Sequence, residues 1–381
     1  MKPITENIIE ESAIKMLQAL GWRYANGKEI SPEGLFCERE HFGQVILPKR
    51  LEAAIARIND HVPLQAQQAA LQKVQRIYSP DIIANNEEFH RMLVERVKIP
   101  YQQNGYERSH EVALIDFENP ANNDYLVVNQ YTIIENNHNK RPDVLLFING
   151  LPVGVIELKN AGDEKADLES AYRQLQTYKS VIPSLFTFNE VCIISDGLEC
   201  RAGSLSADYS RFVAWKTVDG EKEASRFKPE LETLIKGMLQ PKVLLDIIRN
   251  FNVFEKSKKE EEGLVQIRTV KKLAAYHQYF AVNKAVESAV TASGVNGDRR
   301  GGVVWHTQGS GKSLSMVFFS GKLITSPAMQ NPTIVVITDR NDLDDQLFDT
   351  FAASTQLLRQ EPVQAENREH LKQLLQVASG G

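Results

Sequence analysis

The chain has 381 residues and a formal net charge of −5, and at ~100–200 residues per domain this length predicts two or more domains. Its hydrophobic fraction of 42% and its charged fraction of 24% are ordinary for a soluble globular protein, and no apolar run reaches the ~20 residues that a membrane-spanning helix needs. The net charge excludes a uniformly basic nucleic-acid-binding chain, so any contact with DNA has to rest on local positive charge.

Helical and strand patterns alternate through roughly the first 240 residues. Apolar residues recur at helical spacing from Ile9 to Leu20, and Gly21 ends this first predicted helix. Further helices are predicted between residues 48 and 77 and between residues 167 and 181. The order of elements is typical of a mixed α/β domain. Strands are predicted at residues 112–117, 125–134, 144–148, 153–158, 191–195 and 211–215.

A second pattern begins after the charged run EKSKKEEE at residues 255–262, which predicts a solvated linker or an exposed helix face. A strand at 301–306, a helix at 312–324 and an apolar strand at 333–338 form a βαβ pattern, which predicts a parallel sheet. We therefore expect three parts. They are a first domain over residues 1–250, a charged linker over 251–265 and a second domain over 266–381.

The most specific local pattern joins Asp143 to Glu157 and Lys159. Because Glu157 and Lys159 end an apolar strand two residues apart, their side chains share one face of that strand. A turn of two residues after Ile148 would put the two carboxylates on opposite faces, whereas a turn of three residues aligns Asp143 with Glu157. We expect the three-residue turn, because Pro152 has no N–H to pair beside it.

This set of side chains suits the hydrolysis of a phosphodiester. Two carboxylates such as Asp143 and Glu157 can hold one or two Mg²⁺, and the metal lowers the pKa of its bound water. Lys159 can position that water or stabilise the charge that develops on the phosphate. A salt bridge between Lys159 and one acid is the structural alternative, which spacing alone leaves open. Gln174 and Tyr178 lie four residues apart on one helix face, where they can contact the DNA backbone, support the lysine or form ordinary surface.

Residues 306–313, HTQGSGKS, closely follow the phosphate-binding pattern G-x-x-x-x-G-K-[ST], with histidine in place of the first glycine. The backbone N–H groups of such a loop cradle phosphates, Lys312 is expected to reach the β- and γ-phosphates, and Ser313 is expected to hold Mg²⁺. Upstream, Gln278 resembles the adenine-reading glutamine of superfamily 2 helicases. Downstream, Asp339-Arg340 is similar to a helicase motif that touches the nucleic-acid backbone. The predicted ATP-binding set is Gln278, Thr307, Gly309, Ser310, Gly311, Lys312 and Ser313.

These motifs and their order resemble the restriction (R) subunit of type I restriction-modification enzymes, over about residues 6–381. The strings that carry the resemblance are LIDF at 114–117, NQ at 129–130, RPD at 141–143, NGLP at 149–152 and ELKN at 157–160. In that family an Asp, a Glu-x-Lys and a following Gln-x-x-x-Tyr form a PD-(D/E)xK nuclease site. The resemblance therefore implies catalytic roles for Asp143, Glu157, Lys159, Gln174 and Tyr178.

The same resemblance implies a further acid on the first helix, eleven residues before a Gly-Trp pair. Glu10 stands at that place before Gly21-Trp22. A role for Glu10 beside a metal is one interpretation, and a solvated acidic helix face is the other.

The fold implied by the resemblance is a PD-(D/E)xK nuclease-like mixed α/β domain followed by a partial RecA-like parallel α/β helicase domain. The implied enzyme is a type I site-specific deoxyribonuclease that uses Mg²⁺ and ATP, pumps double-stranded DNA and cuts it non-specifically away from the recognition site. Its implied partners are modification (methyltransferase) and specificity subunits. The three cysteines, Cys37, Cys192 and Cys200, show no metal-ligand spacing, which indicates reduced thiols in a cytoplasmic protein.

Two other functions fit the sequence. One is a stand-alone helicase–nuclease for DNA repair or phage defence, and the other is a non-catalytic DNA-binding or assembly module with structural acids. After Ser313 the chain shows neither a second acidic motif on a strand nor a second motor lobe, both of which ATP hydrolysis by a helicase needs. We therefore expect a fragment or truncated product that binds nucleotide without turning it over.

Overall fold

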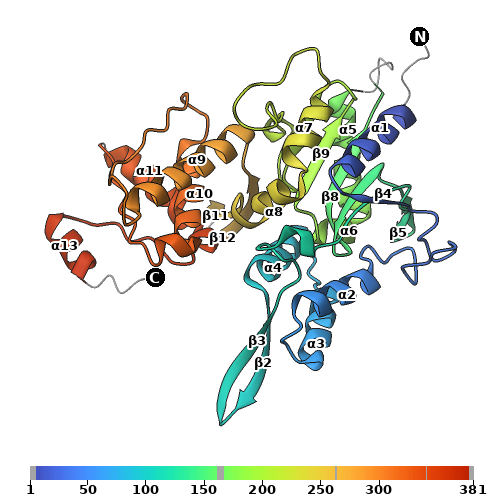
Figure 1. Ribbon diagram of the computed structural model, residues 1–381, viewed down its shortest axis with the longest axis horizontal. Coiled ribbons are helices and arrows are strands. Elements are labelled where there is room, and N and C mark those ends of the chain that lie inside the picture. The colour runs from blue at the N-terminus through green and yellow to red at the C-terminus, as the bar shows by residue number, and fades with distance from the viewer. Residues whose placement is uncertain (1–5, 161–166, 262–263, 340, 377–381) are drawn as a thin grey trace. The chain divides into compact units, whose positions relative to one another are not determined.

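The computed structural model describes residues 6–160, 167–261, 264–339 and 341–376 (Figure 1). The chain divides into two compact units, Met1–Arg249 and Asn250–Gly381. Among the described helices, none combines the length and the apolar character that a membrane crossing requires.

A six-stranded sheet in the order β1-β4-β7-β8-β9-β10 forms the centre of the first unit. The pairs β1–β4 and β8–β9 are parallel and the other neighbours are antiparallel. Every residue of β7 and β8 is buried, so both strands are nearly continuous apolar runs. This architecture confirms the predicted mixed α/β fold. The strands are β1 (Arg23–Asn26), β4 (Tyr125–Asn129), β7 (Val144–Ile148), β8 (Leu151–Leu158), β9 (Val191–Ser195) and β10 (Cys200–Gly203).

Two helices position side chains near the end of β8. Helix α1 (Glu6–Ala19) buries Ile9, Ala13 and Leu17 and contacts β1, β4, β8 and α7 (Glu230–Met238). Helix α5 (Leu168–Val181) contacts β8 and β9, and the side chain of Asp167 caps it by accepting a hydrogen bond from the Ser170 N–H at 2.8 Å. Both helices were predicted. The remaining helices of the unit are α2 (Pro48–Ile58), α3 (Leu64–Gln75), α4 (Ile82–Glu95), α6 (Pro183–Thr187) and α8 (Pro241–Asn250).

Several predicted strands of this unit differ from the structure. Residues 113–117 are not a strand, because the side chain of Asn59 takes up both backbone groups of Ala113 at 2.8 Å. The strand before them is β3 (Tyr106–Val112), which pairs with β2 (Val97–Gln103). The predicted strand 125–134 is divided into β4 and β5 (Ile133–Glu135), which pairs with β6 (His138–Lys140). Around 211–215 only Val213 pairs, with Ala202.

The hairpin between β7 and β8 turns on two residues, Asn149 and Gly150, both of which have positive φ. Ile148 pairs with Leu151 directly across it, so the predicted three-residue turn is wrong. A β-bulge beyond the turn adds one residue to β8 and restores the predicted alignment. Val144 then pairs with Ile156. Asp143 and Glu157, each one residue further from the turn, therefore stand opposite each other on the two strands.

The second unit begins with an antiparallel ribbon of β11 (Asn252–Glu261) and β12 (Leu264–Leu273). The predicted linker at 251–265 is therefore a strand over most of its length. A charged run is compatible with a two-stranded ribbon, because charges on neighbouring strands can pair across it. The ion pair between Glu255 and Lys272 is an example.

Helices make up most of the remainder of the second unit. Helix α10 (Lys312–Thr325) confirms the helix predicted at 312–324, and it packs with α9 (Tyr276–Ser293), α11 (Asn341–Ala352) and α12 (Thr355–Leu358). A short helix α13 (Arg368–Gln376) follows. The core joins Val317 of α10 to side chains of α11 and α12.

The strands predicted at 301–306 and 333–338 do not form in the described part of this unit, and the predicted parallel sheet is accordingly not seen there. Side chains of both segments are exposed, at 91% for Val303 and 85% for Ile337. A strand needs neighbours for its backbone N–H and C=O groups. Neither segment has such a neighbour among the described residues.

Candidate active site and phosphate loop

Asp143, Glu157 and Lys159 meet at one end of the β7–β8 pair. The Lys159 N–H donates to the Ser195 carbonyl at 2.8 Å, which ties the residue after β8 to the end of β9. Its ammonium Nζ donates to Glu157 Oε1 at 2.6 Å. Across the hairpin, Asp143 Oδ2 accepts a hydrogen bond from the Leu158 N–H at 2.7 Å. The three predicted side chains are thus anchored to one strand end.

Burial governs the charges of this group. Glu157 is 2% exposed, and burial together with the neighbouring charge of Asp143 raises its pKa to about 8. Burial also raises the pKa of Asp143 to about 6, against the hydrogen bond from Leu158 and the charge of Lys159. Burial acts to lower the pKa of Lys159, but the charges of Glu157 and Asp143 outweigh it and hold that pKa above its ordinary value. Both carboxyls therefore hold their protons more tightly than free carboxyls do.

The two oxygens of the Glu157 carboxyl differ in their hydrogen bonding. Oε1 accepts the bond from Lys159, whereas the buried Oε2 accepts no hydrogen bond of good geometry from any described residue. Tyr178 lies close enough to act on this carboxyl, but a buried carboxylate oxygen without a well-formed hydrogen bond is costly in a protein interior, and such an oxygen is a suitable ligand for a hard divalent cation. Over the part of the chain that the structure describes, no three His, Cys, Asp or Glu side chains gather into a metal-holding group. A cation here would therefore rely on Asp143 and Glu157.

Helix α5 brings Tyr178 to this site. Its side chain is buried, and the pKa of its phenol is raised by burial first and by the charges of Glu157 and Asp143 next. Gln174, one turn earlier on the same face, is half-buried and lowers the pKa of Tyr178 through a side-chain hydrogen bond. Gln174 therefore acts on Tyr178, and Tyr178 lies beside Glu157.

Glu10 of α1 is buried at 5% exposure, so it is not part of a solvated acidic face. Its Oε1 accepts a hydrogen bond from the side chain of Asn129 at 2.6 Å, and the Tyr24 hydroxyl donates to the same asparagine at 2.9 Å. The charge of Glu10 is close enough to raise the pKa of Asp143. Asn129 belongs to the site's surroundings, and nothing in its sequence context indicated that it would hold Glu10.

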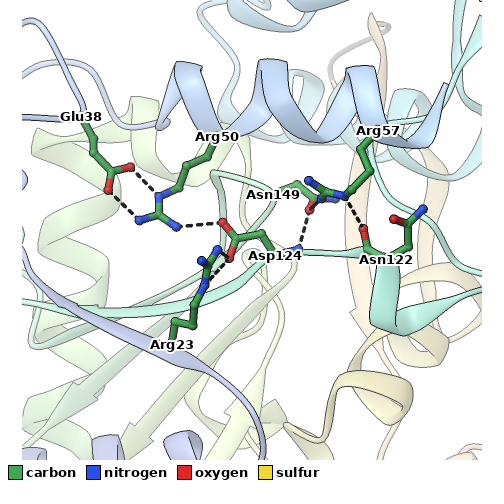
Figure 2. A network of polar contacts seen from close by, with 7 residues as sticks. All are labelled: Arg23, Glu38, Arg50, Arg57, Asn122, Asp124 and Asn149. Atoms are coloured by element: carbon green, nitrogen blue, oxygen red, sulfur yellow. Dashed lines mark hydrogen bonds and ion pairs between the residues drawn. The ribbon is translucent and has the colours of Figure 1, made fainter. Parts of the chain in front are cut away.

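A polar network fixes the other end of the β7–β8 hairpin (Figure 2). The side chain of Asn149 donates to the Leu114 carbonyl at 2.9 Å and accepts from the Asp124 N–H at 2.8 Å. Arg50 links the Asp124 carboxylate, at 2.8 Å, to Glu38. These bonds hold the turn residue Asn149 in place. The turn sets the pairing of Ile148 with Leu151, and the β-bulge beyond it completes the register that aligns Asp143 with Glu157.

In the second unit, the loop predicted to bind phosphate ends where α10 begins at Lys312. Gly309 and Gly311 both have φ of 80°, and a Cβ on Gly311 would lie 2.7 Å from the side-chain nitrogen of Gln278. Lys312 Nζ donates to the carbonyls of His306 at 3.2 Å and Thr307 at 3.1 Å. The loop thus presents its lysine to its own carbonyls. Thr307 is exposed, and Ser310 and Ser313 are half-buried.

Gln278 lies against this loop. Its side chain accepts from the Ala275 N–H at 2.9 Å and donates to the Gly311 carbonyl at 3.0 Å, and only 5% of the residue is exposed. Both of its polar atoms are therefore engaged by the chain. His277, to which no role was assigned from the sequence, has Nε2 3.1 Å from the Ser310 carbonyl. Its only signal in the sequence is its place beside Gln278.

The last predicted site is the Asp339-Arg340 pair. Asp339 is exposed, and Arg340 lies outside the described residues. Within the first unit the structure gathers predicted residues around Glu157, and within the second unit it gathers predicted residues around Lys312. The contact of Asp339 with nucleic acid stays a prediction.

Comparison with known proteins matches two families to this chain. Residues 3–211 match the family described as Type I restriction enzyme R protein N terminus, and residues 277–381 match the SWI2/SNF2 ATPase family. The chain is 45% identical to the HindI endonuclease subunit of a type I restriction enzyme from Haemophilus influenzae, over 98% of this chain and 35% of that protein. It is 30% identical to the provisionally named MjaIXP endonuclease subunit of Methanocaldococcus jannaschii, over 98% of this chain and 36% of that protein.

A third relative is the SauCOLORF180P endonuclease subunit of a type I restriction enzyme from Staphylococcus aureus, at 28% identity over 69% of this chain and 26% of that protein. The chain thus spans about a third of the length of the first two relatives. The family match covers more than half of the chain, including the Glu157 site. The chain belongs to the family of type I restriction enzyme R proteins, whose N-terminal region it matches.

Proposed function

We propose that this chain is a Mg²⁺-dependent endonuclease that cuts double-stranded DNA. The observation that carries the proposal is the meeting of two carboxyls of raised pKa, the half-buried Asp143 and the buried Glu157, with the ammonium of Lys159. The relatives are named as endonuclease subunits, which supports the same chemistry.

Asp143 and Glu157 are the residues that would hold the cation, and a bound Mg²⁺ lowers the pKa of a coordinated water so that it can attack a phosphate. The Leu158 N–H holds Asp143 by its Oδ2. Lys159 keeps a positive charge at the strand end, where it can stabilise charge on a scissile phosphate. Tyr178, supported by Gln174, lies beside Glu157 and limits where its carboxyl can move. Glu10 adds negative charge near Asp143, which favours a cation there.

The test is the nicking of supercoiled plasmid by the protein in Mg²⁺ and in EDTA. We expect nicking in Mg²⁺ alone, and its loss on Lys159→Ala. Lys236→Ala is the matched control, because Lys236 is an exposed lysine that also pairs with a glutamate, Glu232, at 2.6 Å. Nicking by Lys159→Ala at the wild-type rate would leave the Glu157–Lys159 contact as a structural salt bridge and would favour a non-catalytic assembly module.

We further propose that the second unit binds ATP with Mg²⁺ through the phosphate loop. The supporting observation is a helix N-terminus at Lys312 preceded by two glycines of positive φ, which opens backbone N–H groups toward an anion. Phosphates would replace the loop carbonyls as partners of Lys312, and Ser313 would take the metal. A fluorescent ATP analogue should bind the wild type and the control Lys372→Ala, whereas Lys312→Ala should not bind it.

At the level of the whole enzyme, we propose a cytoplasmic restriction subunit that works with modification and specificity subunits, moves along DNA with ATP and cuts non-specifically at a distance. The support is the name shared by the relatives and the pairing of a nuclease region with an ATPase region in one chain. Co-purification with a methyltransferase from the source cell tests this assembly. Absence of a methyltransferase, with nicking intact, would favour the stand-alone helicase–nuclease.

A further inference from the structure

The β2–β3 hairpin projects from the body of the first unit (Figure 1). It is a ribbon of two seven-residue strands, and its root at Val97 and Val112 is buried whereas most of its length is exposed. An isolated two-stranded ribbon is only marginally stable in water. Most residues of both strands are nevertheless at least partly exposed to solvent.

Side chains directly opposite each other on such a ribbon share a face, and the faces alternate along each strand. The pairing register divides the ribbon into two faces. We name them the aromatic face and the acidic face. The aromatic face carries Ile99, Tyr101, Gln103, Tyr106, Arg108 and His110, and the acidic face carries Lys98, Pro100, Gln102, Glu107, Ser109 and Glu111.

Charge is separated between these faces. Both carboxylates of the ribbon, Glu107 and Glu111, lie on the acidic face, where Lys98 stands directly opposite Glu111. On the aromatic face Arg108 stands opposite Tyr101 and makes no ion pair with any residue in the described part of the chain. The aromatic face therefore offers a cation and an imidazole with no carboxylate beside them. In a chain of net charge −5, such a face is one that a polyanion can approach.

Two of the aromatic side chains on this face contact each other, and none of the three is buried. The rings of Tyr101 and His110 stack at 4.1 Å between centroids, with 15° between their planes. Tyr106, beside the turn at the tip, is 73% exposed. At the root of the ribbon, Lys73 Nζ of α3 donates to the Lys98 carbonyl at 3.4 Å. Lys73 lines a cavity of about 520 Å³ beside α3 and α4, together with Arg76 and Glu88.

We propose that the aromatic face of the β2–β3 ribbon is a docking surface for double-stranded DNA. A two-stranded ribbon fits the major groove of B-DNA, which is about 12 Å wide. Arg108 contacts a phosphate, and Tyr106 with the amide of Gln103 lies at the groove. The ribbon thereby holds the substrate of the nuclease. This inference rests on the proposed function for its substrate, and it is tested separately by binding.

Binding of a fluorescent 30-base-pair duplex to the whole chain, in EDTA so that no cutting occurs, is the measurement. Removal of one phosphate contact should weaken binding roughly 5–10-fold at 0.1 M salt and lower the slope of log K against log salt by about 1. We expect this result for Arg108→Ala, and weaker binding again for Tyr106→Ala. Lys98→Ala is the matched control, because it removes the same charge from the acidic face of the same ribbon. It should bind within about twofold of the wild type, since a charge that makes no phosphate contact adds little to affinity.

Equal binding by all three variants and the wild type would overturn the proposal. An equal loss in Arg108→Ala and Lys98→Ala would overturn it too, because the face would then not matter. Unchanged DNA binding with lost capture of a modification subunit would assign the ribbon to a protein partner instead.

Nicking separates this inference from the nuclease proposal. Arg108→Ala should raise the DNA concentration for half-maximal nicking without changing the rate at saturation. Lys159→Ala should stop nicking and still bind DNA. If the wild type binds DNA through Arg108 but does not nick it, the nuclease proposal is refuted and the docking proposal stands.

Discussion

Replacement of Glu157 by glutamine should remove a pH-dependent loss of stability from the metal-free protein. The pKa of Glu157 is raised from 4.5 to about 8 in the folded chain. A carboxyl whose folded pKa is raised contributes stability that is present below its unfolded pKa and is lost as the pH rises through the folded pKa. At pH 6 the unfolded chain has already released this proton and the folded chain still holds it, whereas at pH 8 about half of the folded chains have released it too.

The size of the effect follows from the same values. One proton of difference corresponds to about 1.4 kcal/mol per pH unit, so the folded wild type loses roughly 2 kcal/mol from pH 6 to pH 8. For a unit of this size that loss is about 4–8 °C in Tm. Asp143, with a pKa of about 6, is half deprotonated at pH 6, and it adds only about 0.4 kcal/mol to the loss of stability above that pH.

Thermal unfolding in EDTA at pH 6, 7 and 8 is the assay. The Tm of the wild type should fall relative to that of Glu157→Gln over this window, and saturating Mg²⁺ should remove the fall. Curves that stay parallel for the two proteins would refute the electrostatic account of Glu157.

Three more outcomes are expected. Mg²⁺ must displace a proton from Glu157, so calorimetric titration should show its apparent affinity rising by up to about tenfold per pH unit from pH 6 to pH 8; a constant affinity would contradict this. Gly150→Ala should lower the free energy of unfolding of the first unit by more than about 2 kcal/mol, because a Cβ there would lie 2.5 Å from a carbonyl oxygen. Gly105→Ala, which has a similar φ but open space around it, should lower it by only about 1 kcal/mol, and thermal unfolding measures both. Gly311→Ala should lose ATP binding by more than Gly309→Ala, because only the Gly311 position has a neighbour within 3 Å; equal losses would argue against the loop geometry.

The convergence of Asp143, Glu157 and Lys159 could be predicted because it depends on local rules. Period-two alternation placed Glu157 and Lys159 on one face, and hairpin counting aligned Asp143 with them. The turn itself was wrong, since the alignment depends on a bulge in β8. Bulges respond to packing against neighbouring strands, which a count along one hairpin does not include.

Other features depend on contacts between distant residues. The burial of Glu10 requires Asn129, which lies 119 positions away, and the loss of a strand after Val112 requires Asn59. The charged run after Glu255 forms a strand because a partner strand pairs with it. In the second unit the apolar segment around Ile337 has the composition of a strand, but no neighbouring strand is present among the described residues. The strand propensity of a segment does not show whether another strand is available to pair with it.

The most direct test of the nuclease site compares Mg²⁺-dependent nicking by Asp143→Ala, Lys159→Ala and the double variant, each checked for its fold by circular dichroism. Residues that act as a unit lose activity together, so each single change should reduce the rate by at least about 10³-fold and the double change should reduce it no further. Nicking at the wild-type rate by either correctly folded single variant would contradict the assignment of this site.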